Sequence, residues 1–144
     1  MKGTNIFDRD EFSRWMNEAE NTLRSAVNDK NSGFYNWCCF KCQQAAEFAL
    51  KSYLYGVGAT PFGHSLTKLV NNLSVQKIDI ASILTSCKKL DLFYITSRYA
   101  NAHSSGAPFE YYDENIANEG LEHAQKVIDF IKGLKNERYP ENVL

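Results

Sequence analysis

Two side chains with chemistry to offer stand close together late in the sequence. Arg98 and His103 are separated by four residues, in the stretch RYANAH. A guanidinium can hold a phosphate by two parallel hydrogen bonds and can stabilise charge that builds on its oxygens. An imidazole, which titrates near neutrality, can take a proton from a hydroxyl group or return one to a leaving oxygen. The pair therefore suits phosphate binding, or proton transfer beside a phosphate.

His64 is a third candidate side chain. It stands directly before Ser65, a residue type that caps helices, and an apolar periodic stretch follows. Because helix N-termini attract phosphate, His64 is a candidate phosphate contact. In the alternative, which we favour, its ring hydrogen-bonds the preceding loop and fixes the entry to the helix.

The elements that must position these side chains are predicted to be helices. Residues 34–55 place apolar or small side chains at helical spacing, and residues 79–94 repeat the pattern. Asp8 and Ser65 can cap two further helices, and a last helix is expected to start near Asp113. Short connections favour antiparallel neighbours, so we expect an all-α, up-and-down bundle of about five helices.

The length of 144 residues suits a single domain that spans residues 1–144. Turn chemistry predicts that the first helix ends near Asn28. Residues 1–7 and 135–144 are expected to be loose ends; the second stretch is polar and contains Pro140.

The predicted last connection, residues 95–112, carries both Arg98 and His103 and is rich in small and turn-forming residues. A segment this long between helices is often functional. Asp91, just before it, is a candidate to accept a hydrogen bond from Arg98 or Tyr99. The aromatic residues of segment 95–112 are candidates either to contact a ligand or, as we favour, to pack the segment onto the bundle. They are Tyr99, Phe109, Tyr111 and Tyr112.

The predicted central helix has a polar stripe as well as an apolar face. The stripe includes the i,i+4 pair Glu47 and Lys51, and Phe40, Gln44 and Phe48 lie beside it. Phenylalanines beside a polar stripe suggest a second contact surface, although other helices of the same bundle could cover it. We expect Phe40, Gln44 and Phe48 to form part of a homodimer surface.

The amino-acid composition further restricts the functions that the protein can have. A net charge of -1 argues against a general nucleic-acid-coating protein but leaves room for a local anion site. No Gly-rich phosphate loop and no long apolar run occurs in the sequence. Three of the four cysteines crowd into one predicted helical stretch without nearby histidines, and we expect small core residues and no metal. These features predict a soluble, reduced, cytoplasmic protein without a cofactor or membrane segment.

Three stretches together resemble a known family. QQAAEFALKSYL at 43–54, GHSL at 63–66 and LDLFYITSRYANA at 90–102 are similar, in that order, to HEPN domains, small helical domains. The resemblance covers roughly residues 12–131 and implies the HEPN helical fold.

The resemblance also implies two activities. In the ribonuclease branch of the family, R-x4-6-H motifs cleave RNA without a metal, at a site formed where two protomers meet; here Arg98 and His103 have that spacing. In the branch paired with minimal nucleotidyltransferases, the segment reads R-Y-P and usually lacks the histidine. Tyr99 fits that second branch, whereas Ala100 departs from its proline.

We favour nucleotide or RNA-phosphate binding by a homodimer, with a minimal nucleotidyltransferase as partner in a toxin–antitoxin-type pair. Arg98, Lys51 and His64 would then meet phosphate, and Tyr99 would stack on a base. The first alternative is metal-independent RNA cleavage in which Arg98 and His103 are catalytic. The second is a non-catalytic dimeric scaffold, in which Arg98 forms an ion pair with Asp91 or Glu47.

Overall fold

The computed structural model describes residues 6–141, and every regular element within that range is helical. Five helices have ten or more residues: α1 (Arg9–Asn31), α2 (Tyr35–Gly56), α3 (Leu66–Val75), α4 (Ala81–Asp91) and α6 (Glu114–Arg138). A single-turn helix, α5 (Phe93–Thr96), and two 3-10 turns, η1 (Ala100–Ala102) and η2 (Pro108–Tyr111), complete the set. The predicted all-α bundle of about five helices is confirmed.

The predicted helix starts follow from their capping residues. The Asp8 carboxylate accepts a hydrogen bond from the backbone N–H of Glu11, at 3.0 Å, and the Ser65 hydroxyl accepts one from Lys68. Asp113 caps α6 in the same way. Each cap satisfies one of the N–H groups that an α-helix leaves unpaired at its start.

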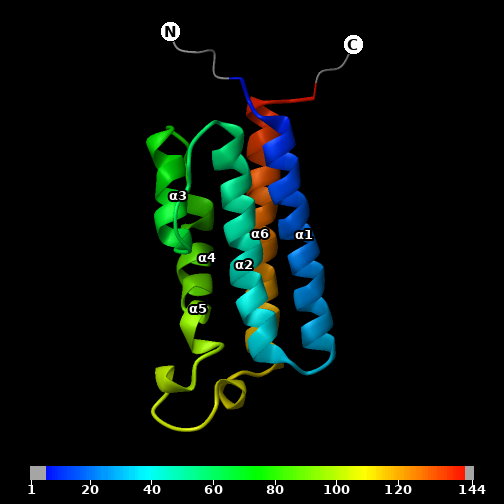
Figure 1. The fold of residues 1–144 in the computed structure, drawn as a ribbon, viewed down its shortest axis with the longest axis vertical. Helices are drawn as coiled ribbons and strands as arrows, with labels where there is room; N and C mark the ends of the chain where they lie inside the picture. The colour runs from blue at the N-terminus through cyan, green and yellow to red at the C-terminus, as the bar shows by residue number, and fades with distance from the viewer. Residues whose placement is uncertain (1–5, 142–144) are drawn as a thin grey trace.

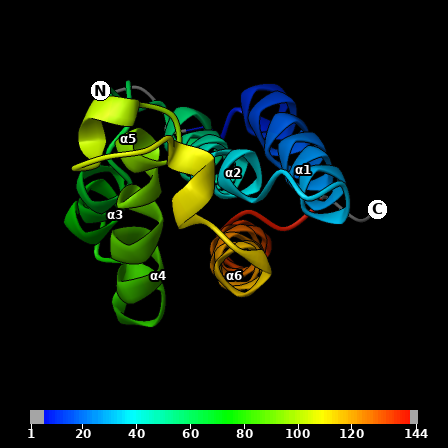
Figure 2. The same ribbon diagram turned by 90° about the horizontal axis from the view of Figure 1, so that it is seen from below.

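Helix α2 lies at the centre of the bundle. It packs along α1 and α6 on one side and against α3, α4 and α5 on the other (Figure 1). The view along the bundle axis shows α6 beneath α2; among the described residues no helix lies over the opposite side of α2, between α1 and α5 (Figure 2). Its buried side chains include the polar Gln43, Glu47 and Lys51 as well as the expected apolar ones.

The expectation of loose ends is wrong where the structure describes them. Phe7 is buried, its ring stacks on Tyr139 at 4.3 Å, and it lies over Gly56, where a Cβ atom would collide with it. Helix α6 continues to Arg138, and Lys135 is buried. The two rings close one end of the bundle over Tyr53, which orders both segments. Residues 1–5 and 142–144 lie outside the described range.

The stretch predicted as one helix over 79–94 is split into α4 and α5 after Asp91. The Asp91 carboxylate accepts hydrogen bonds from the backbone N–H groups of Leu66 and Thr67, at 2.9 and 3.0 Å, and from the Thr67 hydroxyl. It therefore caps α3 from outside that helix, where the helix dipole also favours a negative charge. The expected hydrogen bond from Arg98 or Tyr99 to Asp91 is wrong.

All four cysteines are free and buried in the core. Burial raises the pKa of the Cys87 thiol to about 12, and burial likewise raises the pKa of Cys39. They serve as small core residues. No helix in residues 6–141 is long and apolar enough to cross a bilayer.

We expect the substitution Asp91→Ala to lower the free energy of unfolding by about 2 kcal/mol, because it leaves the first N–H groups of α3 without their acceptor. Guanidinium chloride denaturation followed by circular dichroism measures the change. Asp129→Ala is the matched control: Asp129 is exposed and accepts one hydrogen bond, from Gln125, so its loss should cost much less. Equal losses in the two variants would contradict the capping role.

Candidate functional site

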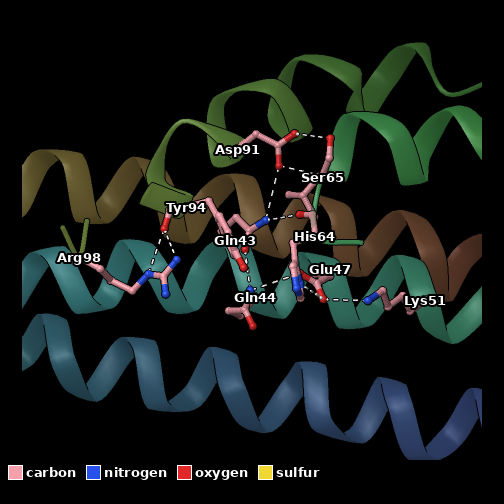
Figure 3. Close-up of polar contacts among 10 residues, drawn as sticks. Gln43, Gln44, Glu47, Lys51, His64, Ser65, Asp91, Tyr94 and Arg98 are labelled. Carbon is pink, nitrogen blue, oxygen red and sulfur yellow. Dashed lines mark hydrogen bonds and ion pairs between the residues drawn. The ribbon is translucent and has the colours of Figure 1, made fainter. Parts of the chain in front are cut away.

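A row of polar and aromatic side chains runs along α2 where α3, α4 and α5 approach it. We call Arg98, Tyr94, His64, Glu47 and Lys51 the polar row (Figure 3). Lys51 and Glu47 come from α2, His64 from the loop before α3, and Tyr94 and Arg98 from α5 and the turn after it. Residues from three separate stretches of sequence thus meet on one side of the central helix.

Arg98 is half-buried among aromatic rings. Its guanidinium carbon lies 4.1 Å from the ring centre of Phe40, 4.7 Å from that of Tyr94 and 4.8 Å from that of Tyr99. Its Nε and one terminal nitrogen donate to the Tyr94 backbone carbonyl, at 3.0 and 2.6 Å. The other terminal nitrogen donates to the Tyr99 hydroxyl, at 3.4 Å. Rings and one carbonyl therefore fix the guanidinium in place.

No carboxylate within residues 6–141 forms an ion pair with Arg98. Asp91 is occupied at the start of α3, and Glu47 binds Lys51 and His64. The ion pair on which the scaffold interpretation depends is therefore wrong. Arg98 keeps its charge without a negative partner in the described part of the chain.

Glu47 holds His64 by its ring. The His64 Nδ1 lies 3.1 and 3.2 Å from the two Glu47 carboxylate oxygens, and Gln43 donates to the His64 backbone carbonyl at 2.8 Å. The Glu47 side chain is 3% exposed, whereas that of His64 is 58% exposed. Because a carboxylate only accepts, Nδ1 carries the proton and Nε2 is the outer nitrogen. The ring stacks on Tyr94 at 5.3 Å.

This geometry bears on both interpretations of His64. The predicted hydrogen bond from the ring to the preceding loop is wrong, because the ring binds Glu47 of α2 instead. That contact and the hydrogen bond from Gln43 to the His64 carbonyl tie the loop to α2. The ring nevertheless keeps an exposed face and nitrogen, so a phosphate contact at His64 stays a prediction.

Lys51 lies at the far end of the polar row from Arg98 (Figure 3). Its Nζ is 3.0 Å from Glu47 Oε2, and its side chain is 11% exposed. Phe40, which contacts Arg98, and Lys51 are eleven residues apart on α2, or roughly 16 Å along the helix axis. The structure brings Lys51 together with Glu47, four residues earlier on α2, and a phosphate contact at Lys51 stays a prediction.

His103 is held apart from Arg98. Its Nε2 lies 2.7 Å from the Thr96 backbone carbonyl, and its ring stacks on Tyr111 at 4.2 Å with 8° between the planes. A carbonyl only accepts, so Nε2 donates. In residues 6–141 no hydrogen bond or ring contact joins His103 to Arg98. One protomer alone does not assemble the pair.

The three residues expected at a homodimer surface lie four residues apart on α2, so they share one face of that helix, and each is partly exposed. Phe48 packs on Trp15, with ring centres 6.0 Å apart, and Phe40 lies beneath Arg98. Gln44 donates to Gln43 and Glu47. The stripe is accessible to a partner, and the dimer stays a prediction.

Tyr94 and Glu47 are the site residues that the sequence analysis did not single out for a site role. Tyr94 looked like part of an apolar helix face, and Glu47 like half of a surface ion pair. Their positions one turn before Arg98 and one turn before Lys51 were the available signals. No cluster of three or more His, Cys, Asp and Glu side chains that could hold a metal occurs in residues 6–141.

Comparison with known proteins identifies the family. The model of the HEPN domain matches residues 12–134. The chain belongs to the HEPN family. The crystal structure of TT1696 from Thermus thermophilus superposes on this HEPN protein with a TM-score of 0.82 and 34% identity, covering 85% of this chain and 96% of that one. No curated protein gives a significant match.

Two further HEPN structures are similar. ST0689, described as an archaeal HEPN homologue, has a TM-score of 0.73 and 36% identity, and covers 85% of this chain and 96% of its own. The HEPN domain protein TM0613 from Thermotoga maritima has a TM-score of 0.67 and 30% identity, with 84% and 96% covered. The match to the family model, residues 12–134, includes the helices that carry the polar row.

We expect Glu47→Leu to cost about 3 kcal/mol of unfolding free energy, because it leaves the ammonium of Lys51 buried without a counter-charge. The double variant Glu47→Leu/Lys51→Leu should be closer to wild type than the single variant, since both charges are then gone. Thermal or chemical denaturation measures the three proteins side by side. A double variant that is less stable than Glu47→Leu would contradict a buried pair whose loss of one partner is the main cost.

Proposed function

We propose that this HEPN protein binds nucleotides, or the phosphate groups of RNA, at Arg98, and that it does so as a homodimer. The observation that carries the proposal is a half-buried guanidinium that has aromatic neighbours and no carboxylate partner among residues 6–141.

The hydrogen bonds of Arg98 support a two-point contact. A guanidinium has five N–H donors, and contacts within the described chain use three: Nε and one on each terminal nitrogen. One N–H remains on each terminal nitrogen, which matches the two-oxygen grip of arginine on phosphate. The aromatic neighbours hold the cation in a weakly polar setting, where an anion gains more from it than in open water.

Tyr99 and His64 fit accessory roles. Tyr99 is 48% exposed beside the guanidinium, so in an RNA ligand a face of its ring can stack on a base next to the nucleotide held at Arg98. The ring of Tyr94 contacts both the His64 ring and the Arg98 guanidinium, so the two side chains lie near the same aromatic residue. The exposed His64 side chain is therefore a candidate for a second phosphate contact beside the one at Arg98.

Metal-independent RNA cleavage by Arg98 and His103 is the alternative. It requires the two side chains to act on one phosphate, and the imidazole of His103 instead donates to the Thr96 carbonyl. Cleavage would therefore need the second protomer, or a movement of His103, to complete the site. Binding at Arg98 needs neither, and we favour it.

The partners follow from the surface and the family. The stripe of Phe40, Gln44 and Phe48 supports a homodimer through α2, because these side chains share one face of the helix and each is partly exposed. A minimal nucleotidyltransferase, in a toxin–antitoxin-type pair, is a partner proposed from family membership alone.

We expect Arg98→Gln to weaken binding of a fluorescein-labelled single-stranded RNA by tenfold or more, since charged hydrogen bonds contribute about 1.5–3 kcal/mol. Arg98→Lys should bind between the two, because it keeps the charge but loses the planar fork. Fluorescence anisotropy gives the affinities.

Arg24→Gln is the matched control for this comparison. It removes the same charge from an exposed arginine of α1, which contacts Asn21, and should leave the affinity near that of wild type. If both variants bind the RNA equally weakly, the loss reflects the overall charge of the protein and not a specific contact at Arg98. RNA cleavage in EDTA that disappears in His103→Ala would favour the ribonuclease alternative.

We expect Gln44→Arg to convert a dimer into monomers, because it adds a charged, bulky side chain at the centre of the proposed interface, opposite its own copy. Gln125→Arg makes the same change on the exposed face of α6 and should leave the dimer intact. Sedimentation velocity distinguishes the species. A wild-type protein that sediments as a monomer, or a Gln44→Arg variant that stays dimeric, would rule out this interface.

A further inference from the structure

A cleft lies on the other side of Arg98 from the polar row, at the end of the bundle where α2 begins. Phe34, Trp37, Pro108 and Phe109 line it, and Arg98 forms part of its wall. We call this the aromatic cleft. Its volume is about 420 Å³, within the range of small-molecule sites. The turn before α2, the first turn of α2 and η2 together build it.

The rings of the aromatic cleft are unusually open for apolar side chains. Phe34 is 57% exposed, Trp37 is 44% exposed and Phe109 is 66% exposed. Large apolar groups that gather on a surface mark a binding site more often than they occur by accident. Their free faces offer stacking area for a flat partner.

The position of the Arg98 guanidinium beside the aromatic cleft indicates which class of ligand the cleft can bind. Phe40 lies between Arg98 and Trp37: its ring is 4.1 Å from the guanidinium carbon and edge-on to Trp37, with ring centres 6.2 Å apart. A cation that still has free N–H groups thus borders a set of exposed rings. A partner that joins a flat ring to an anion complements both features.

We propose that the aromatic cleft holds the base of the nucleotide whose phosphate binds Arg98. This inference rests on the proposed function and deepens it, because it names an unpaired nucleotide as the ligand class. A base inside a duplex is stacked on its neighbours and has no free face to offer. Since ring faces dominate the cleft, stacking holds the base with little preference for its identity.

The two tryptophans allow a direct test. Trp15 stacks on Tyr55 on the α1 side of α2, whereas Trp37 lines the aromatic cleft. In Trp15→Phe the fluorescence of the protein reports on Trp37 alone. Adenosine 5′-monophosphate should quench this fluorescence saturably, whereas ribose 5-phosphate, which has no base, should not quench it.

Phe109→Ala in the same background should weaken binding of adenosine 5′-monophosphate by fivefold or more, the effect of losing one stacking face. Phe62→Ala is the matched control. Phe62 is 92% exposed and lies outside the aromatic cleft, so its loss should not change the affinity. Both side chains are exposed, so neither substitution should endanger the fold.

Three results would overturn the inference. If adenosine 5′-monophosphate displaces labelled RNA but leaves Trp37 fluorescence unchanged, the phosphate binds at Arg98 and the base lies elsewhere, so only the further inference fails. If Trp37 fluorescence responds to protein concentration and not to nucleotide, the aromatic cleft is a contact between subunits. If the nucleotide changes neither the fluorescence nor the RNA signal, and the labelled RNA binds wild type and Arg98→Gln equally weakly, the proposed function fails as well.

Discussion

The arrangement of the site depends on one buried carboxylate. Glu47 lies in the middle of the central helix, almost without exposure, and an ionised group in that position is costly unless it is paired. Lys51, Gln44 and His64 satisfy it from the same helix and from the loop before α3. The contact between His64 and Glu47 holds the loop before α3 against α2. The His64 ring in turn stacks on the ring of Tyr94. Arg98 folds back onto the Tyr94 carbonyl, which completes the polar row.

A second carboxylate connects this row to the helices around it. Asp91 caps α3 from the end of α4 and so fixes α3 and α4 to each other. With Asp91 and Glu47 both committed elsewhere, Arg98 has no acid to pair with among residues 6–141. An arginine that is held by rings and left with free donors is placed to bind an anion from outside the chain.

Local pattern allowed most of the fold to be predicted. The helices follow from periodicity, and Asp8 and Ser65 mark two of the starts, because a cap depends only on residues within one turn. The pairing of Glu47 with Lys51 was likewise local. What the sequence could not supply were contacts between distant segments. The ring of Phe7 on Tyr139, the carboxylate of Asp91 on α3 and the ring of His64 on Glu47 all depend on how the helices pack. The R-x4-H spacing placed Arg98 and His103 near each other in sequence, but the chain between them turns through η1 and directs His103 to Thr96.

We propose that the guanidinium of Arg98 itself meets the phosphate. A titration of the arginine side-chain N–H signals by NMR, in protein labelled with nitrogen-15, tests this contact directly. The chain has five arginines, and Arg98→Lys assigns the signal of Arg98. We expect adenosine 5′-monophosphate to shift the Nε–H signal of Arg98 saturably and to leave the other four in place. A stationary Arg98 signal, with the shift on another arginine or on none, would contradict it.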